Sequence, residues 1–197
     1  VAFFEKLKIQ SELTLEDKTF YAGDIINAKL EASYLAGGYL AGADYSSEWS
    51  SYTSRFRPES KLLRKFRFGI SDDYESISNV SSTKGKLSEN GKTILSCSTS
   101  GNKKEGIPYV YKLETYVTDA SNQRISSSMG VLVHSSRFYI GIGRPVEMNG
   151  FAKKGKILNF PYILVKPDES ILKDMEQKKK KIEYSLEREY WTYDYQN

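Results

Sequence analysis

His134 is the only histidine in this chain of 197 residues, and imidazole is the side chain best suited to general base chemistry near neutral pH. A hydrolase would need this base beside a positioned nucleophile, and Ser135 and Ser136 follow it directly. The histidine also ends a run of alternating residues that is typical of a β-strand. We interpret His134 as a strand-end residue. The enzyme alternative, a hydrolase using His134 with a nearby serine, requires a pocket that contains the imidazole.

Cys97 is the only cysteine, and it alternates with polar neighbours in the context S-C-S. This setting predicts a buried, inert thiol and does not favour a nucleophile. A single cysteine excludes an intrachain disulfide, so the core must form without covalent cross-links. A zinc site needs three or four ligands, which one histidine and one cysteine do not supply.

Three charged or glycine-containing motifs have simple structural interpretations. Asp72, Asp73 and Glu75 could bind calcium, but their spacing matches no calcium loop and we interpret them as solvated loop acids. The four lysines at residues 178–181 could attract a polyanion or an anionic membrane, but glutamates flank them and a solvated turn is the better interpretation. The G-I-G at residues 141–143 lacks the third glycine of a dinucleotide motif. We therefore assign no catalytic, cofactor-binding or metal-binding residue and expect no cofactor.

Composition favours an all-β protein that does not bind nucleic acid. Fifteen Tyr and nine Phe suit pleated, half-buried surfaces, and a net charge of +4 is small for this length. No run of about eighteen apolar residues and no signal-peptide pattern is present, so we expect no direct membrane contact from this chain. The sequence starts at Val1 without an initiator methionine. We expect an excised or processed piece of a longer protein.

The clearest strand pattern lies in residues 20–49, around which the rest of the chain is organised. Apolar and polar residues alternate from Ile26 to Tyr34 and again from Ala43 to Trp49, which gives each strand one dry face and one wet face. Glycines at 37, 38 and 42 supply turns between them. The two strands are predicted to form an antiparallel β unit.

Further short strands are predicted at regular intervals, whereas residues 71–86 are polar and predict a long surface loop. Residues 108–118 and 124–134 together predict a hairpin. Six to eight strands with frequent turns predict an antiparallel β-sandwich of immunoglobulin-like or macroglobulin-like type. The other predicted strands lie within residues 1–15, 62–68 and 93–98.

A change of composition after Gly143 predicts a domain boundary. Strand patterns recur at residues 155–165 and 182–191, but two strands cannot bury a core alone. We therefore predict one complete sandwich at residues 1–143 and a truncated second β domain at residues 144–197.

Several segments follow one another in a recognisable order: Y-A-G-D at residues 21–24 with G-Y-L-A-G-A at 38–43, F-R-F-G at 66–69, residues 87–92, Y-V-T-D at 116–119, and residues 131–141. Their order and spacing resemble one macroglobulin-like domain of the bacterial α2-macroglobulin family and its exit into the next. The segment 181–191 is similar to the strand that precedes the bait region in that family.

The resemblance implies a secreted, periplasmic or cell-surface parent, possibly lipid-anchored, that traps proteases after a bait segment is cut. Many members carry a thioester in a C-E-Q context, which this chain lacks. The implied role is a non-catalytic scaffold that transmits a rearrangement. Its partners would be neighbouring macroglobulin-like domains of the same chain and, through the parent, a protease. The alternative is a cell-surface adhesin or glycan-binding module on the same sandwich, which exposed, coplanar tyrosines would favour.

Overall fold

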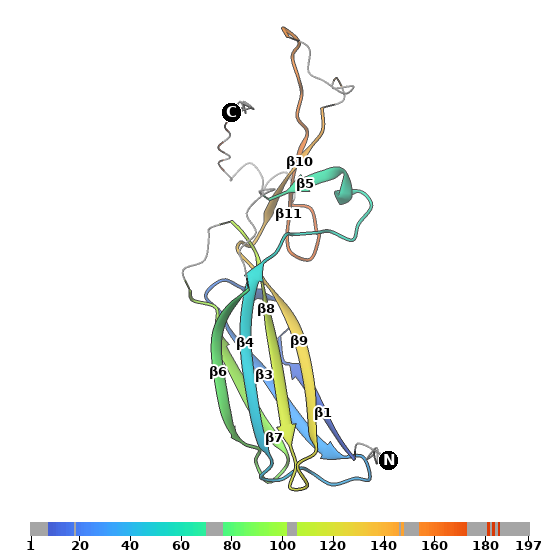
Figure 1. The fold of residues 1–197 in the computed structure, drawn as a ribbon. Helices are drawn as coiled ribbons and strands as arrows, with labels where there is room; N and C mark the ends of the chain where they lie inside the picture. The colour runs from blue at the N-terminus through green and yellow to red at the C-terminus, as the bar shows by residue number, and fades with distance from the viewer. Residues whose placement is uncertain are drawn as a thin grey trace, which may run out of the picture.

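The computed structural model describes residues 8–17, 19–69, 77–101, 106–145, 147, 154–172, 181, 183 and 185. Within these residues the protein is built from β-strands and a single short 3-10 turn. Two sheets form a sandwich, and a third, smaller sheet lies at one end of it (Figure 1). The expected all-β fold class, an antiparallel β-sandwich, is confirmed.

The larger sheet of the sandwich has five strands in the order β2-β9-β8-β4-β6. Its pairs are antiparallel except for the short parallel contact between β2 and β9. The predicted hairpin is present as β8 and β9, which pair from Tyr109 opposite Val133 to Thr118 opposite Arg124. The strands are β2 (Phe20–Tyr21), β4 (Asp44–Thr53), β6 (Ser78–Lys86), β8 (Tyr109–Thr118) and β9 (Arg124–His134).

The smaller sheet of the sandwich consists of β1 (Ile9–Leu15), β3 (Ile25–Tyr34) and β7 (Lys92–Ser98), in the order β1-β3-β7. Ile26 and Leu30 of β3 and Leu113 of β8 are completely buried between the two sheets. Burial follows the alternation of the sequence, because every second side chain of a strand points to the same face. The dry face predicted for β3 is therefore confirmed up to Ala32, while Tyr34 at its end is exposed.

The predicted pairing of residues 26–34 with 43–49 is wrong. β3 pairs with β1 and β7, whereas β4 pairs with β6 and β8, so the two strands lie in opposite sheets. Residues 35–43 form a long connection that crosses the end of the sandwich and buries Leu40. A direct hairpin favours a connection of two to five residues. The glycines correctly predicted turns in this connection, but they did not show which strands pair with each other.

The loop predicted for residues 71–86 is also incorrect over its second half, because Ser78–Lys86 form β6 at the edge of the five-stranded sheet. The polar sequence of β6 did not predict a strand, because this edge strand has no apolar face that packs in the core. Gly85 lies against the ring of Tyr45: a Cβ there would lie 2.9 Å from the Tyr45 hydroxyl, so a larger residue would make this ring shift.

The third sheet contains β5 (Phe66–Phe68), β10 (Tyr139–Gly143) and β11 (Tyr162–Val165), all antiparallel, in the order β11-β10-β5. The strand predicted for 62–68 is thus shorter and follows the 3-10 turn η1 (Leu63–Lys65). Likewise, only residues 162–165 of the segment 155–165 form a strand. The strand predicted for 182–191 lies outside the described residues, apart from residues 183 and 185. This sheet takes strands from both sides of position 143, and the predicted domain boundary there stays a prediction.

Candidate functional site

The candidate site is the junction between the sandwich and the third sheet, and His134 lies at its centre. His134 ends β9 and is only 7% exposed. Its Nδ1 lies 2.9 Å from the hydroxyl oxygen of Tyr139, the first residue of β10. Since β9 belongs to the sandwich and β10 to the third sheet, this hydrogen bond joins the two parts.

Aromatic rings surround that hydrogen bond. Phe56 stacks on Tyr139 with ring centroids 4.3 Å apart and planes at 5°, and meets Phe68 edge-on at 5.2 Å. The ring of Tyr21 on β2 lies 6.1 Å from His134, and Arg137 lies over Tyr21 at 5.3 Å. Each favourable aromatic pair contributes about 0.5–1.5 kcal/mol beyond its burial. The junction therefore ties the ends of β2 and β9 to β5 and β10 through packed rings.

Burial sets the protonation states at the junction. It lowers the pKa of His134 and raises the pKa of Tyr139 to about 12. At neutral pH the imidazole and the phenol are therefore both uncharged, and a hydrogen bond between neutral groups links them. The recorded partner of Nδ1 is a phenol, and no serine, cysteine or carboxylate bonds the imidazole within the described residues. This arrangement is one of packing and positioning.

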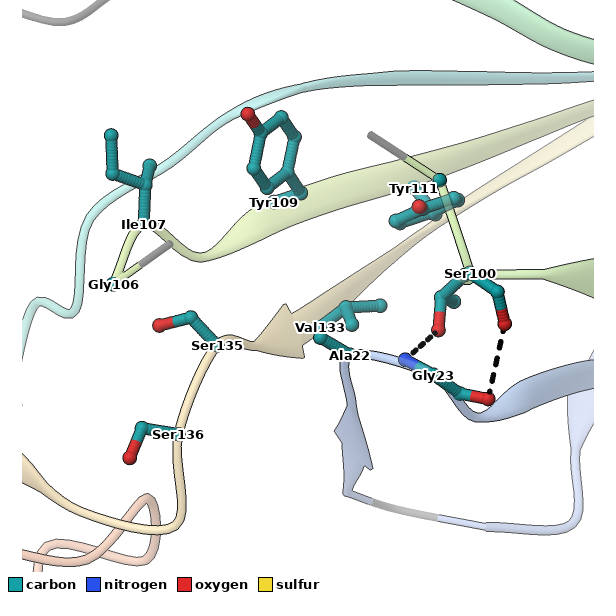
Figure 2. Close-up of a pocket in the computed structure, with 12 residues that line it drawn as sticks. Ala22, Gly23, Ser100, Gly106, Ile107, Tyr109, Tyr111, Val133, Ser135 and Ser136 are labelled. Atoms are coloured by element: carbon teal, nitrogen blue, oxygen red, sulfur yellow. Dashed lines mark hydrogen bonds between the residues drawn. The ribbon is translucent and has the colours of Figure 1, made fainter. Parts of the chain in front are cut away.

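A pocket of about 480 Å³ opens beside the junction at the end of β9. Figure 2 shows its wall: Ser135 and Ser136 lie on the segment after β9, with Gly23 and Ser100 across from them and the tyrosines of β8 along the top of this view. His134 is not a lining residue. The hydrolase alternative requires a pocket that contains the imidazole of His134, and this pocket does not contain it.

The Y-A-G-D motif forms the far wall of that pocket and has a structural role. The Asp24 carboxylate accepts a hydrogen bond of 2.7 Å from the Tyr21 amide, and Gly23 adopts a φ of 100°. The Thr99 hydroxyl accepts from the Gly23 amide at 2.9 Å and donates to the Asp24 carbonyl at 2.8 Å. These bonds fix the turn after β2 to the end of β7.

The other residues considered from the sequence are dispersed. Cys97 is buried in β7 within the main core. Asp72, Asp73 and Glu75 lie outside the described residues, as do the first three of the four lysines at 178–181. Lys181 is exposed and forms an ion pair with Glu183 at 2.9 Å. The structure brings none of them to His134.

Sequence reasoning missed the role of the G-I-G segment. A Cβ on Gly141 would lie 2.5 Å from the ring of Phe68, so this glycine lets β10 approach β5 closely. The described residues contain no group of three or more metal-ligating side chains and no helix long and apolar enough to cross a membrane.

Neither a protein-family model nor the sequence of a curated protein matches the chain. Its fold, however, is similar to solved bacterial α2-macroglobulins. The native conformation of the Escherichia coli protein aligns with a TM-score of 0.62 and 13% identity over 86% of this chain and 11% of that chain. The Escherichia coli protein activated by porcine elastase aligns with a TM-score of 0.63 and 16% identity, over 84% of this chain and 15% of that chain. The Salmonella protein reacted with methylamine aligns with a TM-score of 0.60 and 12% identity, over 83% of this chain and 11% of that chain.

These alignments confirm the macroglobulin-like fold that the sequence motifs indicated. They also fix its extent, because the chain spans only 11–15% of the length of those proteins. What aligns is therefore the fold of one segment of a much longer chain.

Proposed function

We propose that this chain is a non-catalytic scaffold segment of a macroglobulin-type protease-trapping inhibitor. Its task is to hold neighbouring domains at a fixed angle and to pass on a rearrangement after a protease cuts the parent. The proposal is supported by the fold shared with bacterial α2-macroglobulins. It is carried by one observation of this structure, which is the way the sandwich and the third sheet are connected.

By the order of the described strands, the polypeptide passes between the sandwich and the third sheet three times. It enters between β4 and β5, returns between β5 and β6, and enters again between β9 and β10. The last of these connections, residues 135–138, is closed by the hydrogen bond between His134 and Tyr139. A single flexible linker would let two units rotate freely. Several connections around packed aromatic rings instead hold the sandwich and the third sheet in one relative orientation, so that a rotation of one would rotate the other.

The third sheet also offers a surface to a neighbouring domain. Its inner face packs on Phe56 and Leu63, but its outer face leaves Ile142 and Tyr162 more than half exposed. A three-stranded sheet is marginal unless an apolar face is covered. We assign this outer face to an adjacent macroglobulin-like domain of the same longer chain. The parent would act outside the cytoplasm, in the periplasm, at the cell surface or in the medium, and would meet its protease there.

The test is to treat the longer protein that contains this segment with a protease and follow its dimensions by small-angle scattering. We expect compaction after cleavage. We also expect a smaller or slower change in the Phe56→Ala variant, which removes the ring stacked on Tyr139, than in an Ile25→Ala control at an exposed sandwich position. Cleavage without any change of shape would contradict the proposal.

The glycan-binding alternative needs exposed, coplanar tyrosines. The ring contacts among Tyr21, Phe56, Phe68, His134 and Tyr139 join the mostly buried rings of the junction and do not form a row of exposed tyrosines. Specific binding on a glycan array would nevertheless favour that alternative.

A further inference from the structure

A short segment covers the apolar cluster of the third sheet. Residues 57–65, the covering segment, lie between β4 and β5 and are mostly exposed. Its buried residue is Leu63, which is 1% exposed and packs in the cluster that contains Phe56 and Tyr139. The rings of Phe56 and Tyr139 stack on each other at the junction. The covering segment therefore packs on the same cluster that joins the third sheet to the sandwich.

One side chain holds the covering segment by hydrogen bonds. The Glu169 carboxylate accepts from the Glu59 amide at 2.6 Å and from the Ser60 amide at 3.0 Å. The other recorded hydrogen bonds are local: the Arg64 amide donates to the Ser60 carbonyl at 3.1 Å, and the Arg64 Nε donates to the Pro58 carbonyl at 3.3 Å. Among the described residues, Glu169 is thus the polar contact that ties the covering segment to a distant part of the chain.

A tight turn after β11 positions this carboxylate. The Glu169 amide donates to the Lys166 carbonyl at 2.9 Å, and Pro167 restricts φ between them. The Lys166 amide donates to the Ser170 carbonyl at 2.8 Å. The amide and the hydroxyl of Ser170 both donate to the Asp168 carboxylate, at 2.9 Å and 2.6 Å. These bonds fix the turn, so the carboxylate of Glu169 is presented from a rigid support.

The backbone at this position disfavours a glutamate. The φ of Glu169 is 67°, in the left-handed region where a Cβ crowds the following carbonyl oxygen and glycine is preferred. The other non-glycine residue with positive φ in the described part is Asn122, a type that tolerates this conformation. A glutamate in the left-handed region indicates a role for its carboxylate that offsets the unfavourable backbone.

The contact made by Glu169 connects opposite edges of the third sheet. The turn that carries Glu169 follows β11, at one end of the strand order β11-β10-β5, whereas the covering segment leads into β5 at the other end. The two edges are thus joined by a route that does not pass through the ladder of β10. Glu169 is only partly buried and Glu59 is exposed, so water can replace these hydrogen bonds when the contact opens.

We propose that Glu169 is a releasable anchor for the covering segment. Loss of its two hydrogen bonds lets residues 57–65 move off the cluster while the sandwich and the β10–β11 pair stay folded. Leu63 then leaves the cluster, and the stacked rings of Phe56 and Tyr139 lose a side chain that covers them. Such local opening needs few contacts to break, and the junction is loosened from the side of the third sheet. The inference concerns the third sheet and does not depend on the proposed function.

Thiol labelling on the whole chain tests whether the covering segment moves. In a Cys97→Ala background, Leu63→Cys places a buried thiol under the segment, and Leu113→Cys places one in the sandwich core. We expect Glu169→Gly to speed labelling at position 63 at least about tenfold, because two hydrogen bonds to a charged group are lost. Labelling at position 113 should not change. Equal labelling at 63 with and without Glu169→Gly, or the same acceleration at 113, would overturn the proposal.

Amide hydrogen exchange with Leu63 intact separates the carboxylate from the backbone of Glu169. Glycine suits a left-handed turn, so Glu169→Gly should slow exchange at Leu172, whose amide closes the turn, or leave it unchanged. Exchange at Arg64, within the released segment, should become faster in the same variant. Glu89→Gly, which removes an exposed carboxylate from another turn, is the matched control and should change neither amide. Unchanged exchange at Arg64 in Glu169→Gly would overturn the proposal.

Discussion

The sandwich and the third sheet reach stability in different ways. The sandwich buries a large continuous core between sheets of five and three strands, with Trp49, Leu113 and Ile26 almost fully enclosed. The third sheet has three short strands drawn from distant parts of the chain, and its cluster has five buried members among the residues that the structure describes. Stability in a protein is distributed unevenly in this way. The sandwich has a large core of its own, whereas the third sheet relies on the junction and on segments that pack against it.

The most severe change should come from the sandwich core. Trp49 is 2% exposed, and Trp49→Ala should cost about 3–5 kcal/mol through lost burial and a large cavity. Denaturant unfolding monitored by circular dichroism measures the loss. Trp49→Phe is the control: the indole N–H is buried without a recorded hydrogen-bond partner, so losing that group should cost less than losing the ring. Equal losses for both variants would contradict this view of the core.

A smaller and local effect is expected from Gly141→Ala. The added methyl would overlap the ring of Phe68 and should destabilise the third sheet by about 1–3 kcal/mol. Hydrogen exchange should rise in β10 and β11 and stay unchanged in β3 and β8. Gly130→Ala, where the nearest side-chain atom is 3.6 Å from the new Cβ, is the matched control on β9. Faster exchange throughout the sandwich would show that the two regions are one cooperative unit.

The strands of the sandwich could be predicted from the sequence better than the pairing of the third sheet. Period-two alternation predicted β3, β4, β8 and β9, because burial on one face of a long strand leaves a direct pattern in residue type. It missed β6, whose edge position requires no apolar face. It also could not show that Phe66–Phe68 leave the sandwich to pair with β10, since strand pairing between distant segments depends on tertiary contacts. His134 was correctly placed at a strand end, but its contact with Tyr139 follows from the junction alone.

At the junction itself, Tyr139→Phe removes the hydroxyl that bonds His134 and leaves a buried imidazole nitrogen without this partner. The expected cost is about 1–3 kcal/mol, smaller than that of the core substitution. The chemical shifts of the His134 ring and exchange in residues 135–139 report it. Tyr116→Phe on the exposed side of β8 is the control. If the ring shifts of His134 did not change, the hydrogen bond would be absent in solution.

Acidification should produce the smallest effect, and it should act through His134. The pKa of this residue is lowered in the folded state because burial disfavours the charged imidazole, so the unfolded chain binds its proton more readily. The stabilisation is complete above the unfolded value near 6.5 and is lost as pH falls from there through the folded pKa. The protection factors of amides at the junction, which correct for the slower intrinsic exchange in acid, should therefore fall as the pH drops from neutral through the folded pKa of His134. The His134→Asn variant should lack this part of the pH dependence.

The central claim is that the junction holds the sandwich and the third sheet at one fixed angle. Residual dipolar couplings of backbone amides, measured separately for β3 with β8 and for β10 with β11, test it most directly. We predict a single alignment tensor for both regions in the natural chain, and separate tensors after Phe56→Ala. Two different tensors in the natural chain would show independent motion and would contradict the account.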